Sequence, residues 1–119
     1  ESIGVCATCV RVPVFNGHAE SILAEFHHAM DAGRAKELLK TSPGILLSES
    51  LADNNELSYP TQIDCEGNDA TYVGRIRNDP SAQNSIAMWC VSDNLRKGAA
   101  TNAVQIAEIL IRDYLSPTA

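Results

Sequence analysis

The chain has 119 residues, the size of one ordinary domain and too short for a cofactor-binding domain together with a substrate domain. Its formal net charge is −6 and it has no basic run, which argues against nucleic acid as a partner, because phosphate binding needs clustered Lys and Arg. No apolar run is long enough to cross a membrane, and no signal-peptide pattern occurs. We therefore expect a cytoplasmic protein without a membrane partner.

The beginning of the chain predicts a β-hairpin. Residues 5–15 are rich in β-branched and small apolar residues, which favour a strand. Asn16-Gly17 suits a two-residue type I′ turn, because both residues tolerate positive φ angles. A returning strand would then run from residue 18 to about residue 26.

This predicted hairpin would bring an arginine and a histidine together. In it Phe15 pairs with His18 and Arg11 pairs with Ile22, so the side chains of Arg11 and His18 share one face and one groove. A guanidinium binds a carboxylate through two parallel hydrogen bonds, and an imidazole exchanges a proton near neutral pH. The pair therefore suits a small anionic substrate. The alternative is that both are ordinary surface residues of an exposed hairpin.

The middle of the chain predicts a helix, a short strand and a connection. Residues 31–40 are good helix formers with an acidic start and a basic end, which the helix dipole favours, and Ser42-Pro43-Gly44 ends the helix. Residues 44–48 suit a brief strand. Residues 51–69 are polar and predict a long connection.

The last part of the chain predicts a second hairpin and a long helix. Residues 71–77 and 85–91 are strand-like and are separated by turn-forming residues. From residue 94 to residue 114 apolar residues recur at helical spacing, and Ser92 or Asp93 can cap the start. The apolar face of this helix either lacks its natural partner or packs on the chain's own sheet.

Four cysteines in such a chain indicate reduced thiols rather than a disulfide framework. Cys6-Ala-Thr-Cys9 has the C-x-x-C spacing of redox and zinc motifs, but within a strand the two sulfurs would point to opposite faces. No second Cys pair or properly spaced His pair completes a zinc site. We expect buried structural thiols and no metal.

Several segments share their order and spacing with a known family. They are Cys9-Val-Arg-Val-Pro-Val14, Gly17-His18-Ala-Glu20, Tyr72-Val-Gly-Arg-Ile-Arg-Asn-Asp79, Val91-Ser-Asp-Asn-Leu-Arg-Lys-Gly-Ala-Ala100 and Asn102-Ala-Val-Gln-Ile-Ala-Glu108. Over nearly the whole chain they resemble the C-terminal part of aspartate-semialdehyde dehydrogenase. The resemblance implies that residues 1–92 belong to a substrate-binding and dimerisation domain. Residues 93–119 would form a C-terminal helix that packs on an NADP-binding domain.

The resemblance also implies the fold, the reaction and three site residues. The fold would be α+β, with a mixed, largely antiparallel sheet, helices on one face and the long C-terminal helix. The family reduces L-aspartyl 4-phosphate to aspartate 4-semialdehyde with NADPH, through a cysteine thioester, in lysine, threonine and methionine biosynthesis. In this chain His18 would be the acid/base catalyst, Arg11 would bind the substrate carboxylate, and Asn94 would contact the cofactor.

Two parts of that chemistry do not occur in the sequence. No cysteine follows an asparagine, as the nucleophile of the family does, and no G-x-G-x-x-G cluster occurs. We therefore expect a fragment of a homo-oligomeric enzyme, inactive by itself, whose N-terminal NADP-binding domain precedes it. The alternative is a noncatalytic dimerisation or interaction module. The roles of Arg75, Arg77 and Lys97 stay open, with solvent, a subunit interface and the substrate phosphate as possible surroundings for the first two.

Overall fold

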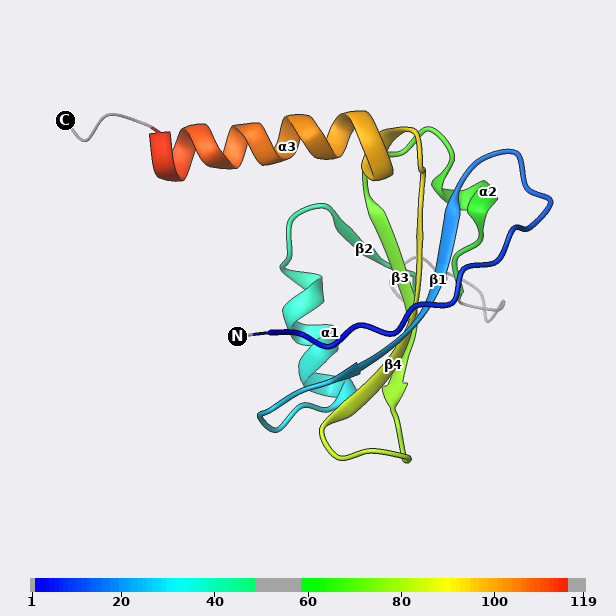
Figure 1. Ribbon diagram of the computed structural model, residues 1–119, viewed down its shortest axis with the longest axis vertical. Helices are drawn as coiled ribbons and strands as arrows, with labels where there is room; N and C mark the ends of the chain where they lie inside the picture. Colours follow the sequence, from blue (N-terminus) through cyan, green and yellow to red (C-terminus); the bar gives the residue numbers. More distant parts are fainter. Residues whose placement is uncertain (1, 49–58, 116–119) are drawn as a thin grey trace.

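A four-stranded mixed sheet forms the centre of the computed structural model, which describes residues 2–48 and 59–115 (Figure 1). The strands lie in the order β1 (His18–Glu25), β4 (Ser85–Ser92), β3 (Thr71–Asn78) and β2 (Ile45–Leu47). β1 and β3 run antiparallel to β4, while β2 runs parallel to β3. This confirms the predicted α+β class, the mixed and largely antiparallel sheet, and the second hairpin.

The main core lies between one face of the sheet and helix α1 (Ala32–Lys40). The Asp31 carboxylate accepts the Arg34 N–H at 2.7 Å and caps the helix, so the predicted helix is confirmed with its acidic start. Ala35 of α1 packs with three buried side chains of the sheet, which are Val73, Ile76 and Ile86. Burial of each large apolar side chain contributes about 1.5–3 kcal/mol.

A smaller cluster lies on the opposite face of the sheet. It joins Tyr72 and Val91 to Cys65 of α2 (Gln62–Cys65). Tyr72 and Val73 are adjacent in β3, so they point to opposite faces, and α2 covers the face that α1 leaves free. The prediction of helices on one face therefore holds for α1 but not for α2, which lies within the predicted connection. Residues 51–58 of that connection lie outside the described residues.

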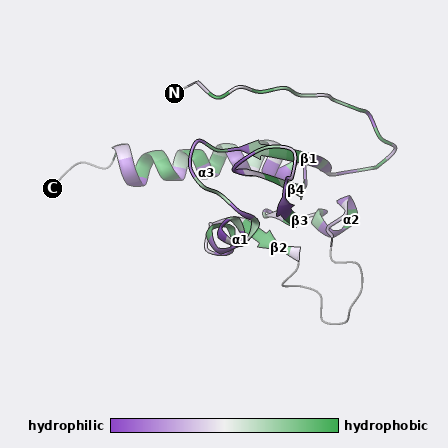
Figure 2. Cartoon of the chain, turned by 90° about the horizontal axis from the view of Figure 1, so that it is seen from below, coloured by the Kyte–Doolittle hydropathy of each residue, from purple (hydrophilic) through white to green (hydrophobic). Residues whose placement is uncertain are grey.

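The C-terminal helix is continuous from Arg96 to Leu115 and confirms the predicted long helix. α3 (Thr101–Leu110) forms its centre, and wider π-type turns flank it at Arg96–Ala100 and Ile111–Leu115. Figure 1 shows the helix running away from the end of the sheet, and Figure 2 shows apolar bands along it. Its large apolar side chains are exposed, among them Val104, Ile106, Ile109, Leu110, Tyr114 and Leu115. Of the two alternatives, the structure favours a face without a partner among the described residues.

The predicted N-terminal hairpin is wrong. Residues 2–15 contain no strand, and β1 pairs with β4 instead, with His18 opposite Ser92 and Ile22 opposite Met88. Figure 2 shows the N-terminal segment running well apart from the sheet. The returning strand of the prediction was right, but its partner was not. Arg11 and His18 therefore do not share a hairpin groove.

Tertiary contacts of the Asn16-Gly17 dipeptide explain the difference. The Asn16 side chain donates a hydrogen bond from Nδ2 to Glu66 Oε1 at 2.8 Å, and the Gly17 N–H donates to Asn94 Oδ1 at 2.8 Å. These contacts with distant residues replace the local turn. Cys6 and Cys9 are both exposed in the extended segment, so the expectation that they are buried thiols is also wrong. No helix in residues 2–48 or 59–115 is long and apolar enough to cross a membrane.

Candidate functional site

His18 is the first residue of β1, and its backbone is fixed by the sheet while its side chain is exposed. It lies opposite Ser92, the last residue of β4. Because Ser92 ends β4, the next two residues, Asp93 and Asn94, leave the sheet close to His18. The structure thus brings together two of the three predicted site residues, His18 and Asn94.

Gly17 connects these two residues. It is buried, its φ angle is +92°, and its N–H donates to Asn94 Oδ1 at 2.8 Å. A Cβ atom at this position would lie 2.9 Å from Gln62 Cβ and 3.2 Å from Cys65 Sγ, so no larger residue fits without displacing α2. A positive φ angle adds strain for any residue with a side chain. Glycine is therefore required immediately before His18 for two independent reasons.

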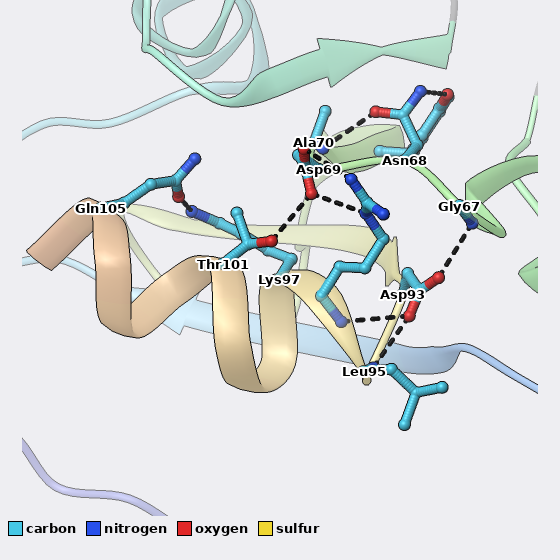
Figure 3. Close-up of polar contacts among 11 residues, drawn as sticks. Gly67, Asn68, Asp69, Ala70, Asp93, Leu95, Lys97, Thr101 and Gln105 are labelled. Atoms are coloured by element: carbon cyan, nitrogen blue, oxygen red, sulfur yellow. Dashed lines mark hydrogen bonds and ion pairs between the residues drawn. The ribbon is translucent and has the colours of Figure 1, made fainter.

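Asp93 holds the chain on the other side of Asn94. Its carboxylate is buried and accepts three backbone N–H groups, from Gly67 at 2.9 Å, Leu95 at 2.8 Å and Arg96 at 3.2 Å (Figure 3). The hydrogen bond from Gly67 is the main cause that holds the pKa of Asp93 below its ordinary value. Of the two predicted caps, Ser92 and Asp93, it is therefore Asp93 that accepts N–H groups at the start of the C-terminal helix, and Asp93 also anchors the loop after α2.

A second polar group attaches the helix to the loop before β3. The Asp69 carboxylate forms a two-point ion pair with Arg96, at 2.7 Å from Nε and 2.9 Å from Nη2. Thr101 Oγ1 donates to the same carboxylate at 2.8 Å (Figure 3). These bonds, led by the one from Arg96, lower the pKa of Asp69. The direction in which the helix leaves the sheet is thus set by Asp69 and Asp93 together.

Arg11 lies apart from this arrangement. It belongs to the extended segment, is exposed, and makes no hydrogen bond or ion pair with residues 2–48 or 59–115. The sequence placed it beside His18 through a hairpin that the structure does not contain. A role at the substrate stays a prediction from the resemblance.

The basic residues whose roles the sequence left open make local contacts. Arg75 lies in an irregular stretch of β3 with a φ angle of +54°, and its guanidinium lies 6.0 Å from the ring centre of Tyr59. Arg77 Nη1 donates to the carbonyl of Arg75 at 3.0 Å. Lys97 Nζ donates to Gln105 Oε1 at 2.6 Å, and the two residues lie eight positions apart along the C-terminal helix (Figure 3). Each of these contacts joins neighbouring parts of the chain and leaves the roles of the three residues as predictions.

The cysteine nearest to the site is a packing residue. Cys65 is fully buried beneath Gly17, and its thiol donates to the carbonyl of Gln62 at 3.1 Å. Burial, followed by the negative charge of Asp93, raises its pKa. Burial also raises the pKa of Cys90 to about 11. A protonated, buried thiol is a poor nucleophile, so these environments suit structural roles.

Sequence reasoning missed α2 and the contacts that it supports. A signal was present, because Thr61-Gln62-Ile63-Asp64 has the form of a capping box. In the structure the Asp64 carboxylate accepts the Thr61 N–H at 2.6 Å and its hydroxyl at 2.7 Å. The bond between Gly17 and Asn94 had no signal, because it joins residues 77 positions apart.

Comparison with known proteins identifies the family. The family model described as semialdehyde dehydrogenase, dimerisation domain, matches residues 1–97. Aspartate-semialdehyde dehydrogenase of Aquifex aeolicus is 50% identical over 97% of this chain, which corresponds to 33% of that protein. Aspartate-semialdehyde dehydrogenase 2 of Vibrio cholerae is 52% identical over 95% of this chain and 32% of that protein.

Solved structures agree with this result. The crystal structure of aspartate semialdehyde dehydrogenase II from Vibrio cholerae complexed with ASA has a TM-score of 0.73 and 48% identity, and it covers 87% of this chain and 30% of that one. The chain belongs to the semialdehyde dehydrogenase dimerisation-domain family. Within it, the similar proteins named above are aspartate-semialdehyde dehydrogenases. The chain spans about a third of the length of these curated relatives.

Proposed function

We propose that this chain is the substrate-binding and dimerisation part of an NADP-dependent aspartate-semialdehyde dehydrogenase. The supporting observation is its 50% identity over 97% of its length to a curated relative of that name. The complete enzyme would reduce L-aspartyl 4-phosphate to aspartate 4-semialdehyde and serve lysine, threonine and methionine biosynthesis. It would act in the cytoplasm, where the four thiols, unpaired in this structure, stay reduced.

In this proposal each site residue has one task. His18, exposed at the start of β1, moves the proton that the reacting oxygen or the nucleophile exchanges. Arg11, on the extended segment, binds the substrate carboxylate through its guanidinium. The nucleophilic cysteine would belong to the part of the enzyme that this chain does not span, because no cysteine here follows an asparagine and the raised pKa values of Cys65 and Cys90 disfavour the thiolate.

Asn94 is the proposed contact for the nicotinamide cofactor. Its Oδ1 is occupied by the N–H of Gly17, while its Nδ2 makes no hydrogen bond with the described residues. A free amide N–H fits a cofactor that offers carbonyl acceptors. When bound, the cofactor supplies the hydride. The chain's contribution is to orient and to transfer protons.

The test is a chimera in which this chain replaces the matching third of the Vibrio cholerae enzyme. We expect NADP reduction that depends on aspartate semialdehyde and phosphate. Arg11→Leu should then lower kcat/KM by roughly 30-fold or more, because a charge pair with the substrate is lost. This factor corresponds to a loss of about 2 kcal/mol of transition-state stabilisation. Arg34→Leu on α1 is the matched control and should change little. An unchanged kcat/KM in Arg11→Leu would remove Arg11 from the site.

A noncatalytic dimerisation module is the second candidate. The family description names a dimerisation domain, and the chain exposes apolar side chains along the C-terminal helix. Sedimentation of the chain by itself measures its self-association, and a monomer would count against this candidate. The two candidates separate in the chimera, because a module without a catalytic role would tolerate His18→Ala at full activity.

A further inference from the structure

Asn94 faces the residue before His18 with a defined atom. The Gly17 N–H donates at 2.8 Å to the Asn94 side chain. A backbone N–H can pair only with an acceptor, so the amide must present its oxygen to Gly17 and turn its NH₂ group elsewhere. The orientation of this side chain therefore follows from the chemistry of its partner.

The backbone around His18 is held from two sides. On one side, His18 pairs with Ser92 as the first rung of the ladder between β1 and β4. On the other side, Gly17 has a φ angle of +92° and packs against Gln62 of α2, and its N–H is tied to Asn94. No ladder bond holds Gly17, because β1 begins one residue later. The side chain of Asn94 thus supplies a hydrogen-bond acceptor to the residue that comes immediately before the first paired residue of β1.

Asn94 is itself held firmly enough for this purpose. Its neighbour Asp93 is buried at 4% exposure and is bound by backbone N–H groups on two elements, the loop after α2 and the start of the helix. Asn94 therefore lies between a fixed residue and a helix. Its hydrogen bond can restrict the motion of the Gly17 backbone.

We propose that Asn94 is a positioning residue for His18, acting through the N–H of Gly17. This inference rests on the proposed function, because the proposed function assigns proton transfer to His18. It divides the two amide atoms of Asn94 between two tasks, with Oδ1 orienting the backbone of His18 and Nδ2 left for a ligand. Loss of the oxygen should then affect turnover, and loss of the nitrogen should affect ligand binding.

The first measurement is amide hydrogen exchange of Gly17 by NMR in the 119-residue chain. Asn94→Leu keeps the size but removes the acceptor, and we expect Gly17 exchange to accelerate on the order of tenfold or more. Asn94→Asp keeps the acceptor and should preserve protection. Asn102→Leu, an exposed asparagine on α3, is the matched control and should leave Gly17 unchanged. Asn94→Ala replaces Asn94→Leu if the latter does not fold.

The second measurement is the division between kcat and KM in the chimera. We expect Asn94→Leu to lower kcat by roughly tenfold to a hundredfold, the range for a misplaced catalytic group. Asn94→Asp should keep kcat within about threefold while it raises the KM for NADP, because the acceptor is kept and the donor is lost. A purely structural role would not produce rescue of kcat by the aspartate variant.

The outcomes separate the two proposals. Unchanged Gly17 exchange in the variants without the acceptor would overturn the positioning role, and so would an Asn94→Leu chimera with normal kcat. An inactive wild-type chimera would count against the proposed function, while the exchange measurement would still decide whether Asn94 orients Gly17. If Asn94→Asp loses kcat as fully as Asn94→Leu, positioning through the oxygen is refuted.

Discussion

The buried carboxylate of Asp93 accepts the backbone N–H of Gly67 at 2.9 Å, and so joins the start of the C-terminal helix to the loop after α2. The same carboxylate accepts two N–H groups of the helix itself. One side chain therefore joins the junction between β4 and the helix to the loop at Gly67, which is 26 residues away in the sequence. Asn94 lies next to it and points to Gly17.

Acid should destabilise the chain through Asp93 and Asp69. Both pKa values are lowered in the fold, so both groups stabilise it above their unfolded pKa of about 3.9, and this stabilisation is lost as the pH falls through the folded values. The free energy of unfolding should fall below about pH 4 to 5. Asp93→Asn should flatten this dependence, and Glu108→Gln, an exposed control, should not. Urea unfolding at pH 7 and pH 3.5 measures the loss of unfolding free energy in each variant. An equal loss in Asp93→Asn and Glu108→Gln would contradict the stabilising role of the Asp93 carboxylate.

Gly17→Ala should cost more stability than Gly67→Ala. Both positions have positive φ angles, +92° and +74°, but only at Gly17 does the new Cβ meet another residue, Gln62 at 2.9 Å. At Gly67 no described atom lies within 4 Å of it. We expect losses of about 2 to 4 kcal/mol for Gly17→Ala and about 1 kcal/mol for Gly67→Ala. Chemical denaturation compares the two, and equal costs would show that close packing at Gly17 is unimportant.

The four cysteines should divide into two fast and two slow thiols. Cys6 and Cys9 are exposed, whereas Cys65 is buried and the pKa of Cys90 is raised to about 11. At pH 8 only a small fraction of the Cys90 thiol is ionised, and the thiolate is the form that reacts. Alkylation followed by peptide mass analysis should label Cys6 and Cys9 first and the other two only after denaturant is added. Early labelling of Cys90 in the native chain would disagree with its burial.

Truncation of matched isoleucines should separate the core from the helix face. Ile86 is 2% exposed and Ile106 is 51% exposed, so the same change removes different amounts of buried surface. Ile86→Ala should destabilise by about 2 to 5 kcal/mol. Ile106→Ala should change stability by less than about 1 kcal/mol, since alanine also favours the helix. A large loss at Ile106 in the isolated chain would mean that the helix face is covered, for example by a second copy.

Local patterns predicted most of the elements. The helix at Ala32–Lys40 follows from its formers and its Asp31 cap, and the strands at Thr71–Asn78 and Ser85–Ser92 follow from their composition and the turn between them. These signals lie within one element or between neighbours. The structure brings His18 and Asn94 close together and leaves Arg11 apart from them, while the roles of all three stay predictions.

The sequence by itself determined most element types, apart from the strand predicted at residues 5–15 and the missed α2, together with the missing nucleophile pattern and the family, because hydrophobic period, capping residues and motif spacing are local properties of the chain. Only the tertiary structure decided which strand pairs with β1, where Gly17 donates its N–H, and that residues 2–15 stay outside the sheet. Asn16-Gly17 favours a hairpin when considered locally. Contacts with Glu66 and Asn94, far along the chain, outweigh that preference, because β1 gains the apolar strand β4 as its partner.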